Sequence, residues 1–255
     1  MDIELHNHRE VERLNQRGGR TLTVVDLIRA GTLSVPMAAC AMRAMAGGAS
    51  LLTGARPGGA GKTTLLASIL HLLPPGVRIV TVDKPRRLAE AAAGGEPEST
   101  CHLVHEIGDG HWYGYLWGPE VAEFFALIGG RQCVASCLHA DTLEELTAIL
   151  TSRPLGVPRA AIGRVGLILF MHVSRTRAGY QRRVSAFYEA DGRGERRLLF
   201  RWDPATDAFE AAGRPLDPQG LSPYADFLAR LVEEGASDAD SVRRKVLSFY
   251  AQQQR

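Results

Sequence analysis

A glycine-rich run that ends in a lysine and two threonines carries the clearest chemistry in the sequence. Residues 51–66 read LLTGARPGGAGKTTLL, in which an apolar strand-like stretch precedes the glycines and an apolar helix-like stretch follows them. Glycines let backbone N–H groups approach a polyphosphate, and a helix that begins here adds its partial positive charge. In such a P-loop the lysine bridges the β- and γ-phosphates and the threonine holds Mg²⁺. We therefore expect Mg²⁺ at Thr63 and the phosphates of ATP at Gly58, Gly59, Ala60, Gly61, Lys62, Thr63 and Thr64.

The loop departs from the usual pattern at its first position. The pattern has a glycine five residues before Gly61, where this chain has Arg56, and Gly54 comes two residues too early. We expect Arg56 at the mouth of the phosphate site, where it either contacts phosphate or holds the loop open. The simpler alternative is a glycine-rich turn that binds nothing, and the Gly-Lys-Thr-Thr ending after an apolar strand argues against it.

The cysteines suggest a second kind of site. Cys133, Cys137 and His139 have a spacing that metal ligands can have, and Cys101 and His105 are possible further ligands. However, Cys133 and Cys137 share one face of a predicted strand, where thiols usually pack as small apolar side chains. Buried thiols are therefore favoured over a zinc site.

Composition narrows the class of protein. The chain has 255 residues, of which 45% are hydrophobic and 23% are charged, and its formal net charge is +2. This charge is too small to indicate nucleic acid or an anionic membrane as the main partner. Arginines are concentrated in 175–201, and a solvated strand face is favoured there over a surface for an acidic partner. Because no apolar stretch approaches the length of a membrane span or a signal peptide, we expect a cytoplasmic protein.

The predicted elements alternate around the glycine-rich loop. A β-branched run over 78–82 ends at Asp83, as expected for a buried parallel strand, and another predicted strand over 133–138 ends just before His139. Later strands over 165–173, 183–189 and 197–202 are joined by turns, and two helices follow. We predict an α/β fold: a P-loop NTPase (RecA-like) core with a parallel sheet, late antiparallel strands and a C-terminal helical segment. The expected parts are a tail or short helix over 1–21, the ATPase domain over 22–215 and the helical segment over 216–255.

Several stretches together resemble a known family. They are VDLIRAGTLS (25–34), PPGVRIVTVDKPRRL (74–88), GPEVAEFFALIGG (118–130), SCLHADTLEEL (136–146) and VSRTRAGYQRRVSAFYEADG (173–192). In this order and spacing they resemble the ATPase superfamily of type II and type IV secretion systems and type IV pilus assembly, including its tight-adherence and archaeal branches. From the resemblance we expect the family's large N-terminal domain to be essentially missing here.

The resemblance implies a motor. It implies a homo-oligomeric ring, or a partner of a related motor, that docks on an inner-membrane platform protein and so lies in the cytoplasm at the inner face of the membrane. It also implies catalytic roles for Asp83, in the position of the family's Asp box, and for His139, in its His box, facing the γ-phosphate. A histidine that merely caps the next helix is the plainer alternative for His139.

The departures from the family concern hydrolysis. Where the family has Gly-Glu-x-Arg-Gly, this chain has Gly114-Tyr115-Leu116-Trp117-Gly118, so Tyr115 replaces a catalytic carboxylate. A phenol is neutral at pH 7 and cannot take that role. We expect reduced hydrolysis, with partial compensation by Asp83, because we expect the strand that it ends to adjoin the P-loop strand. If this stretch is misaligned, the acids to consider are Glu106, Asp109 and Glu120.

Three functions therefore remain open. The first is an ATP-binding motor ATPase with a degenerate Walker B strand. The second is a catalytically inactive nucleotide-binding subunit, regulatory or structural, of the same kind of system. The third, an unrelated P-loop kinase or nucleic-acid translocase, is disfavoured because no second-substrate motif is present and the net charge is close to zero.

Overall fold

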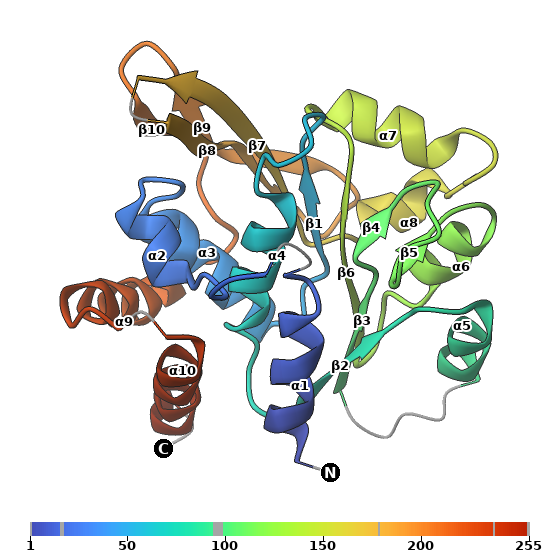
Figure 1. Ribbon diagram of the computed structural model, residues 1–255, viewed down its shortest axis with the longest axis horizontal. Coiled ribbons are helices and arrows are strands. Elements are labelled where there is room, and N and C mark those ends of the chain that lie inside the picture. The colour runs from blue at the N-terminus through green and yellow to red at the C-terminus, as the bar shows by residue number, and fades with distance from the viewer. Residues whose placement is uncertain (1, 16–17, 94–98, 178, 237, 254–255) are drawn as a thin grey trace.

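One mixed sheet with helices on both faces forms the fold (Figure 1). The computed structural model describes residues 2–15, 18–93, 99–177, 179–236 and 238–253. The strands are β1 (Leu51–Gly54), β2 (Val77–Thr81), β3 (Ser99–Leu103), β4 (Glu106–Ile107), β5 (Tyr115–Leu116), β6 (Gln132–Leu138), β7 (Leu167–Thr176), β8 (Gly179–Ala190), β9 (Arg196–Asp203) and β10 (Ala208–Ala211). Their main path runs in the order β10-β9-β8-β7-β1-β6-β3-β2, with β4 and β5 paired beside it. Strands β2, β3, β6, β1 and β7 are mutually parallel, and β8 to β10 are antiparallel additions.

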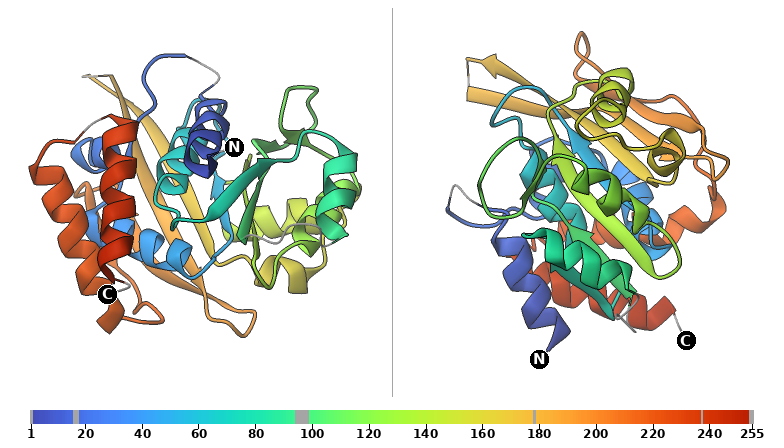
Figure 2. Two further views of the ribbon diagram at one scale, coloured as in Figure 1. Left: turned by 90° about the horizontal axis from the view of Figure 1, so that it is seen from below. Right: turned by 90° about the vertical axis from the view of Figure 1, so that its right-hand side faces the viewer.

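Helices cover both faces of this sheet (Figures 1 and 2). One face carries α1 (Ile3–Glu12), α2 (Val24–Arg29), α3 (Val35–Ala46), α4 (Lys62–Leu70), α9 (Ser222–Glu233) and α10 (Ala239–Gln253). The opposite face carries α5 (Pro85–Ala92), α6 (Glu120–Ala126), α7 (Leu143–Thr151) and α8 (Arg159–Gly163). A short 3₁₀ helix, η1 (Gln219–Leu221), precedes α9. Among the described residues no helix is long and apolar enough to cross a membrane.

Two apolar cores follow from this arrangement. Successive side chains of a strand point to opposite faces, so Leu51 of β1 joins the core under α4 while Leu52 joins the core under α6 and α7. On β7, Leu169 likewise joins the core under α4, and Phe170 joins the core under α6 and α7. Both faces of the central strands are thus buried, which is why they read as continuous apolar runs.

The predicted α/β class, the mostly parallel sheet and the late antiparallel strands are confirmed. A capping box opens α2, because the side chains of Thr23 and Asp26 each accept a hydrogen bond from the other's backbone N–H. Helices α5 and α8 and strand β10 were not predicted. Part of the charged stretch between α5 and β3, residues 94–98, lies outside the described residues.

The predicted neighbour of the P-loop strand is wrong. Strand β1 lies between β6 and β7, whereas β2, which ends just before Asp83, is at the far end of the path beyond β3. After β1 the chain crosses through α4 to the edge of the sheet and then returns inward through β3 and β6. Asp83 is therefore separated from the loop by β3 and β6.

Helix α1 covers the exposed edge of β2. The Asn7 side chain donates to the Val77 carbonyl and accepts from the Ile79 N–H, both at 2.8 Å, so its amide takes the place of a neighbouring strand's peptide. His6 Nε2 lies 2.8 Å from the Ile79 carbonyl, and Thr81 donates to the Glu10 carboxylate. Residues 1–21, expected to be a tail or a short helix, thus include a helix that satisfies backbone groups at a sheet edge.

We expect Asn7→Ala to lower the free energy of unfolding by about 2 kcal/mol, because it leaves a buried carbonyl and a buried N–H without their partner. Denaturant unfolding measures the change. Arg9→Ala, at an exposed position of the same helix, is the control and should change stability by less than about 0.5 kcal/mol. Equal effects of the two substitutions would contradict the edge-covering role of Asn7.

Candidate active site

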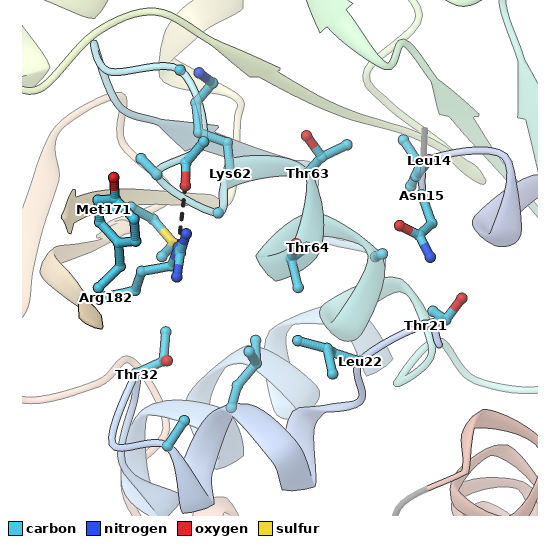
Figure 3. Close-up of a pocket in the computed structure, with 18 of the residues that line it drawn as sticks. Leu14, Asn15, Thr21, Leu22, Thr32, Lys62, Thr63, Thr64, Met171 and Arg182 are labelled. Atoms are coloured by element: carbon cyan, nitrogen blue, oxygen red, sulfur yellow. Dashed lines mark hydrogen bonds between the residues drawn. The ribbon is translucent and has the colours of Figure 1, made fainter. Parts of the chain in front are cut away.

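A large cavity opens at the carboxyl end of β1. Its volume is about 1130 Å³, and its walls include residues 58–64, the start of α2 and the facing ends of β7 and β8. Figure 3 shows Thr63 and Thr64 on α4, with Thr21 and Leu22 across the cavity and Arg182 to one side. Ligands of α/β proteins bind at this end of parallel strands. The glycine-rich loop, residues 55–61, therefore lies at the end of the sheet where a bound ligand is expected.

Two glycines are required by the geometry of the loop. A Cβ at Gly54 would lie 2.6 Å from the Ala140 carbonyl oxygen and 2.7 Å from the Phe170 ring, so no larger residue fits where β1 ends. Gly61, directly before α4, has φ of 100°, which L side chains rarely adopt. Thr53 also ties β1 to the helix by donating to the Lys62 carbonyl at 3.2 Å. The strand, the loop and α4 are thus held as one unit.

Lys62 is buried at the start of α4. Only 5% of its surface is exposed, and its ammonium donates to the Ala55 carbonyl at 3.1 Å. The same Nζ lies 3.4 Å from His139 Nδ1. A buried ammonium without a carboxylate partner is costly unless an anion can reach it. Among the described residues no acidic group forms an ion pair with Lys62, and the cavity is the side from which an anion can approach.

His139 joins the loop to an acid. Its Nδ1 lies 2.7 Å from the Arg56 carbonyl oxygen. Its Nε2 lies 3.1 Å from Glu106 Oε1. His139 is 47% exposed and the Glu106 carboxylate 16% exposed, so the pair borders the cavity.

Glu106 is a carboxylate in the wall of the cavity, and Tyr115 lies beside it. The two residues are register partners of the parallel pair β4 and β5. Burial, followed by the charge of Glu106, raises the pKa of Tyr115 to about 12. Tyr115 is therefore a neutral donor at physiological pH. By resemblance to the family, the catalytic carboxylate is expected at the position of Tyr115. The structure brings the Glu106 carboxylate next to that position.

Oxygen donors suited to Mg²⁺ converge near Cys137. Thr63 lies near the Cys137 sulfur, and Glu106 Oε2 lies 3.9 Å from the same atom. A hydroxyl and a carboxylate thus approach one point at the start of α4, which fits the preference of Mg²⁺ for oxygen ligands. Cys137 itself donates to the His105 carbonyl at 2.9 Å, and burial raises its pKa to about 12, so it remains a thiol.

The alternative metal site receives no support. All four cysteines are free and buried, as expected for thiols packed as apolar side chains. Burial lowers the pKa of His105 to about 4, so this ring is neutral as well as enclosed. No group of three or more His, Cys, Asp or Glu side chains in the described part of the chain is arranged to hold a metal ion.

Two predicted site residues lie away from the cavity. Arg56 directs its guanidinium to Glu145 of α7, with contacts of 2.5 and 3.2 Å, and its backbone N–H donates to Asp141. Asp83, beyond the edge strand, lies 4.0 Å from Arg87. Neither Arg56 nor Asp83 lines the cavity. The backbone of Arg56 takes part in the site through its carbonyl, whereas its side chain fastens the loop to α7.

Residues missed by the sequence analysis also reach the loop. Arg182 of β8 donates from Nε to the Gly59 carbonyl at 3.1 Å, and Met171 of β7 lies beside Gly61 (Figure 3). Arg182 could be noticed in the sequence only through the many arginines of its segment, which we interpreted as a solvated strand face. Glu106 was named in the sequence analysis only as one of the acids that could replace Tyr115.

Comparisons with known proteins come from sequence and from structure. No protein-family model matches the chain. An uncharacterised protein of Methanocaldococcus jannaschii is 23% identical over 211 residues, which cover 74% of this chain and 78% of the relative. Putative conjugal transfer proteins from two strains of Mycobacterium tuberculosis are 31% identical over 160 residues, 53% of this chain. The chain matches 46% of the length of these transfer proteins.

Two solved ATPases are similar in structure. The VirB11 ATPase of the Brucella suis type IV secretion system, in complex with sulphate, is 17% identical with a TM-score of 0.42, over 74% of this chain and 62% of that chain. The Legionella pneumophila ATPase DotB is 15% identical with a TM-score of 0.38, over 83% of this chain and 55% of that chain.

The pKa of Tyr115 can be tested by difference spectroscopy. At about pH 10.5 an ordinary phenol is mostly ionised, whereas a phenol with a pKa of about 12 is not. We therefore expect folded wild type and Tyr115→Phe to have the same phenolate absorbance at that pH. In denaturant the wild type should show one more phenolate than the variant, which serves as the control. A lower absorbance of the folded variant would contradict the burial of Tyr115 against Glu106.

Proposed function

We propose that this chain binds Mg-ATP and is an ATPase of a secretion or type IV pilus-like assembly system. The observation that carries the proposal is the single cavity bordered by the glycine-rich loop, Lys62, Thr63, Glu106 and His139. A loop of this sequence between a buried strand and a helix is the P-loop arrangement. The relatives named as putative conjugal transfer proteins support a transport context, as do the stretches that resemble secretion ATPases.

The loop residues take the phosphate chain. Backbone N–H groups of 58–63 at the start of α4 contact phosphate oxygens, and Lys62 leaves the Ala55 carbonyl to bridge the β- and γ-phosphates. Thr63, with Glu106 beside it, would hold Mg²⁺, which when bound neutralises charge on the phosphates. Thr64, Thr21 and Leu22 line the part of the cavity left for the nucleoside.

Glu106 takes the role of the catalytic carboxylate. Phosphoryl transfer to water needs an acceptor that orients the nucleophile, and a carboxylate can do this where the neutral Tyr115 cannot. In this structure His139 contacts Glu106, so nucleotide binding would have to separate the two. Although Tyr115 carries no carboxylate, we propose that hydrolysis is retained through Glu106 instead of Asp83.

A second candidate is a nucleotide-binding regulatory or structural subunit without turnover. The His139–Glu106 contact favours it, because a carboxylate that stays paired with His139 cannot orient water. In either case we propose assembly into a homo-oligomeric ring or with a related motor, in the cytoplasm at an inner-membrane platform protein. ATP would favour such assembly by mass action if it binds between subunits.

Nucleotide binding should depend on Lys62. Lys62→Ala removes the buried ammonium that would contact the phosphates, and we expect binding of a fluorescent ATP analogue to weaken by at least about 100-fold. Lys245→Ala, at an ion pair with Glu234, is the matched control and should bind as wild type does. An unchanged affinity in the folded Lys62 variant would contradict the proposed site.

Turnover should depend on Glu106 and not on Asp83. We expect Glu106→Gln to lower kcat by about 10²–10⁴ and to weaken binding of Mg-ATP by much less, because the amide keeps an oxygen beside Thr63 but loses the charge that acts in the transition state. Asp83→Asn, which removes an acid outside the cavity, is the control and should leave steady-state hydrolysis unchanged.

Two outcomes would change this assignment. If Asp83→Asn lowered kcat and Glu106→Gln did not, Asp83 would be the catalytic acid, as the sequence predicts. Tight ATP binding without any wild-type turnover, alone or mixed with a related motor, would favour the regulatory subunit.

A further inference from the structure

We infer that Arg182 is a second cationic ligand of the phosphate chain, supplied within the same subunit by the β7–β8 hairpin. The inference rests on the proposed function, because it assumes that a polyphosphate occupies the glycine-rich loop. It adds a residue that neither the loop motif nor the comparisons assign. In the sequence this arginine is one of several in a basic segment, and nothing in its spacing sets it apart.

The position of Arg182 is the first argument. Strand β8 pairs with β7, and β7 pairs with β1, so the hairpin brings Arg182 to the side of the loop through the sheet itself. Its Nε donates to the Gly59 carbonyl at 3.1 Å, and a Cβ at Gly61 would lie 3.2 Å from its Cδ. The side chain thus lies across the segment where phosphate is expected, as the dashed hydrogen bond in Figure 3 shows.

The charge of Arg182 is the second argument. The residue is half-buried, and within the described ranges no carboxylate forms an ion pair with it. Its cationic contact is instead the ring of Tyr180, 5.6 Å from the guanidinium carbon. Of the other arginines of β8 and β9, Arg183 is paired with Asp207, Arg197 with Glu189 and Arg201 with Glu210, whereas Arg196 donates to the Val165 and Ile162 carbonyls away from the loop. Among the described residues, Arg182 is therefore the half-buried arginine of β8 that lines the cavity without a paired carboxylate.

The chemistry of the guanidinium is the third argument. Arginine has five N–H donors in a planar fork that suits phosphate oxygens, and the Gly59 carbonyl takes only one of them. Lys62 belongs to α4 and Arg182 to the hairpin, and both line the cavity. Two cations at one cavity are stabilised when a polyanion binds there. A phosphoryl-transfer site gains from such a charge in the transition state.

The test compares binding of Mg-ATP by calorimetry in wild type and three variants at several salt concentrations. We expect Arg182→Gln, which can still donate to Gly59 but has no charge, to bind about 10- to 100-fold more weakly than wild type. Its affinity should also fall less steeply with salt, because one ion pair to phosphate is gone. Arg182→Lys keeps the charge. Its affinity for Mg-ATP should lie between those of wild type and Arg182→Gln, and its salt dependence should equal that of wild type. Arg201→Gln, one strand away and paired with Glu210, should bind as wild type does.

The outcomes separate this inference from the proposed function. Wild-type affinity in Arg182→Gln overturns the inference, and so does weaker binding with an unchanged salt dependence, which would mean that the arginine only props the loop. If Arg182→Gln does not fold, Arg182→Lys decides, because a salt dependence shallower than wild type would also overturn the inference. The proposed function fails separately, if wild type binds no ATP or if Lys62→Ala binds as tightly as wild type.

Discussion

The close approach at the end of β1 is the constraint on which the site depends. Gly54 lies against the Ala140 carbonyl and the Phe170 ring with no room for a side chain, so β6 and β7 meet β1 at this point. The residue before Ala140 is His139, and the residue after Phe170 is Met171, and both border the cavity. A substitution that forced these strands apart would therefore move the histidine, the loop and the hairpin together. Packing and chemistry at this point cannot be varied independently.

In the structure, the polar groups around the loop form hydrogen bonds with other groups of the same chain. Lys62 bonds to Ala55, His139 to the carbonyl of Arg56, and Arg182 to the carbonyl of Gly59. A phosphate chain must exchange these contacts for its own oxygens, so the net gain on binding is the difference between two sets of hydrogen bonds. The acid Glu106 takes part in the same closed network through His139.

The features that could be predicted from the sequence are those set by residues close together along the chain. The loop, the capping box at Thr23 and the buried strands were predictable because glycine spacing, capping residues and apolar runs act over a few neighbours. The order of strands is not local, which is why Asp83 was expected beside β1 although its strand lies at the edge. Glu106 was hard to identify because β4 and β5 have two residues each, too short for any periodicity. Arg182 was hidden for a similar reason, since only the pairing of β8 with β7 brings it to the loop.

The helix that covers β2 has a practical consequence for anyone who handles shortened forms of the protein. A side-chain amide can occupy the backbone groups of an edge strand without offering a new edge in its turn, so α1 closes the sheet where another strand would extend it. A fragment cut after residue 15 would keep the glycine-rich loop and yet present β2 as a template for strands of other copies. Insolubility of such a fragment is the outcome expected from intermolecular strand pairing at the bared edge of β2.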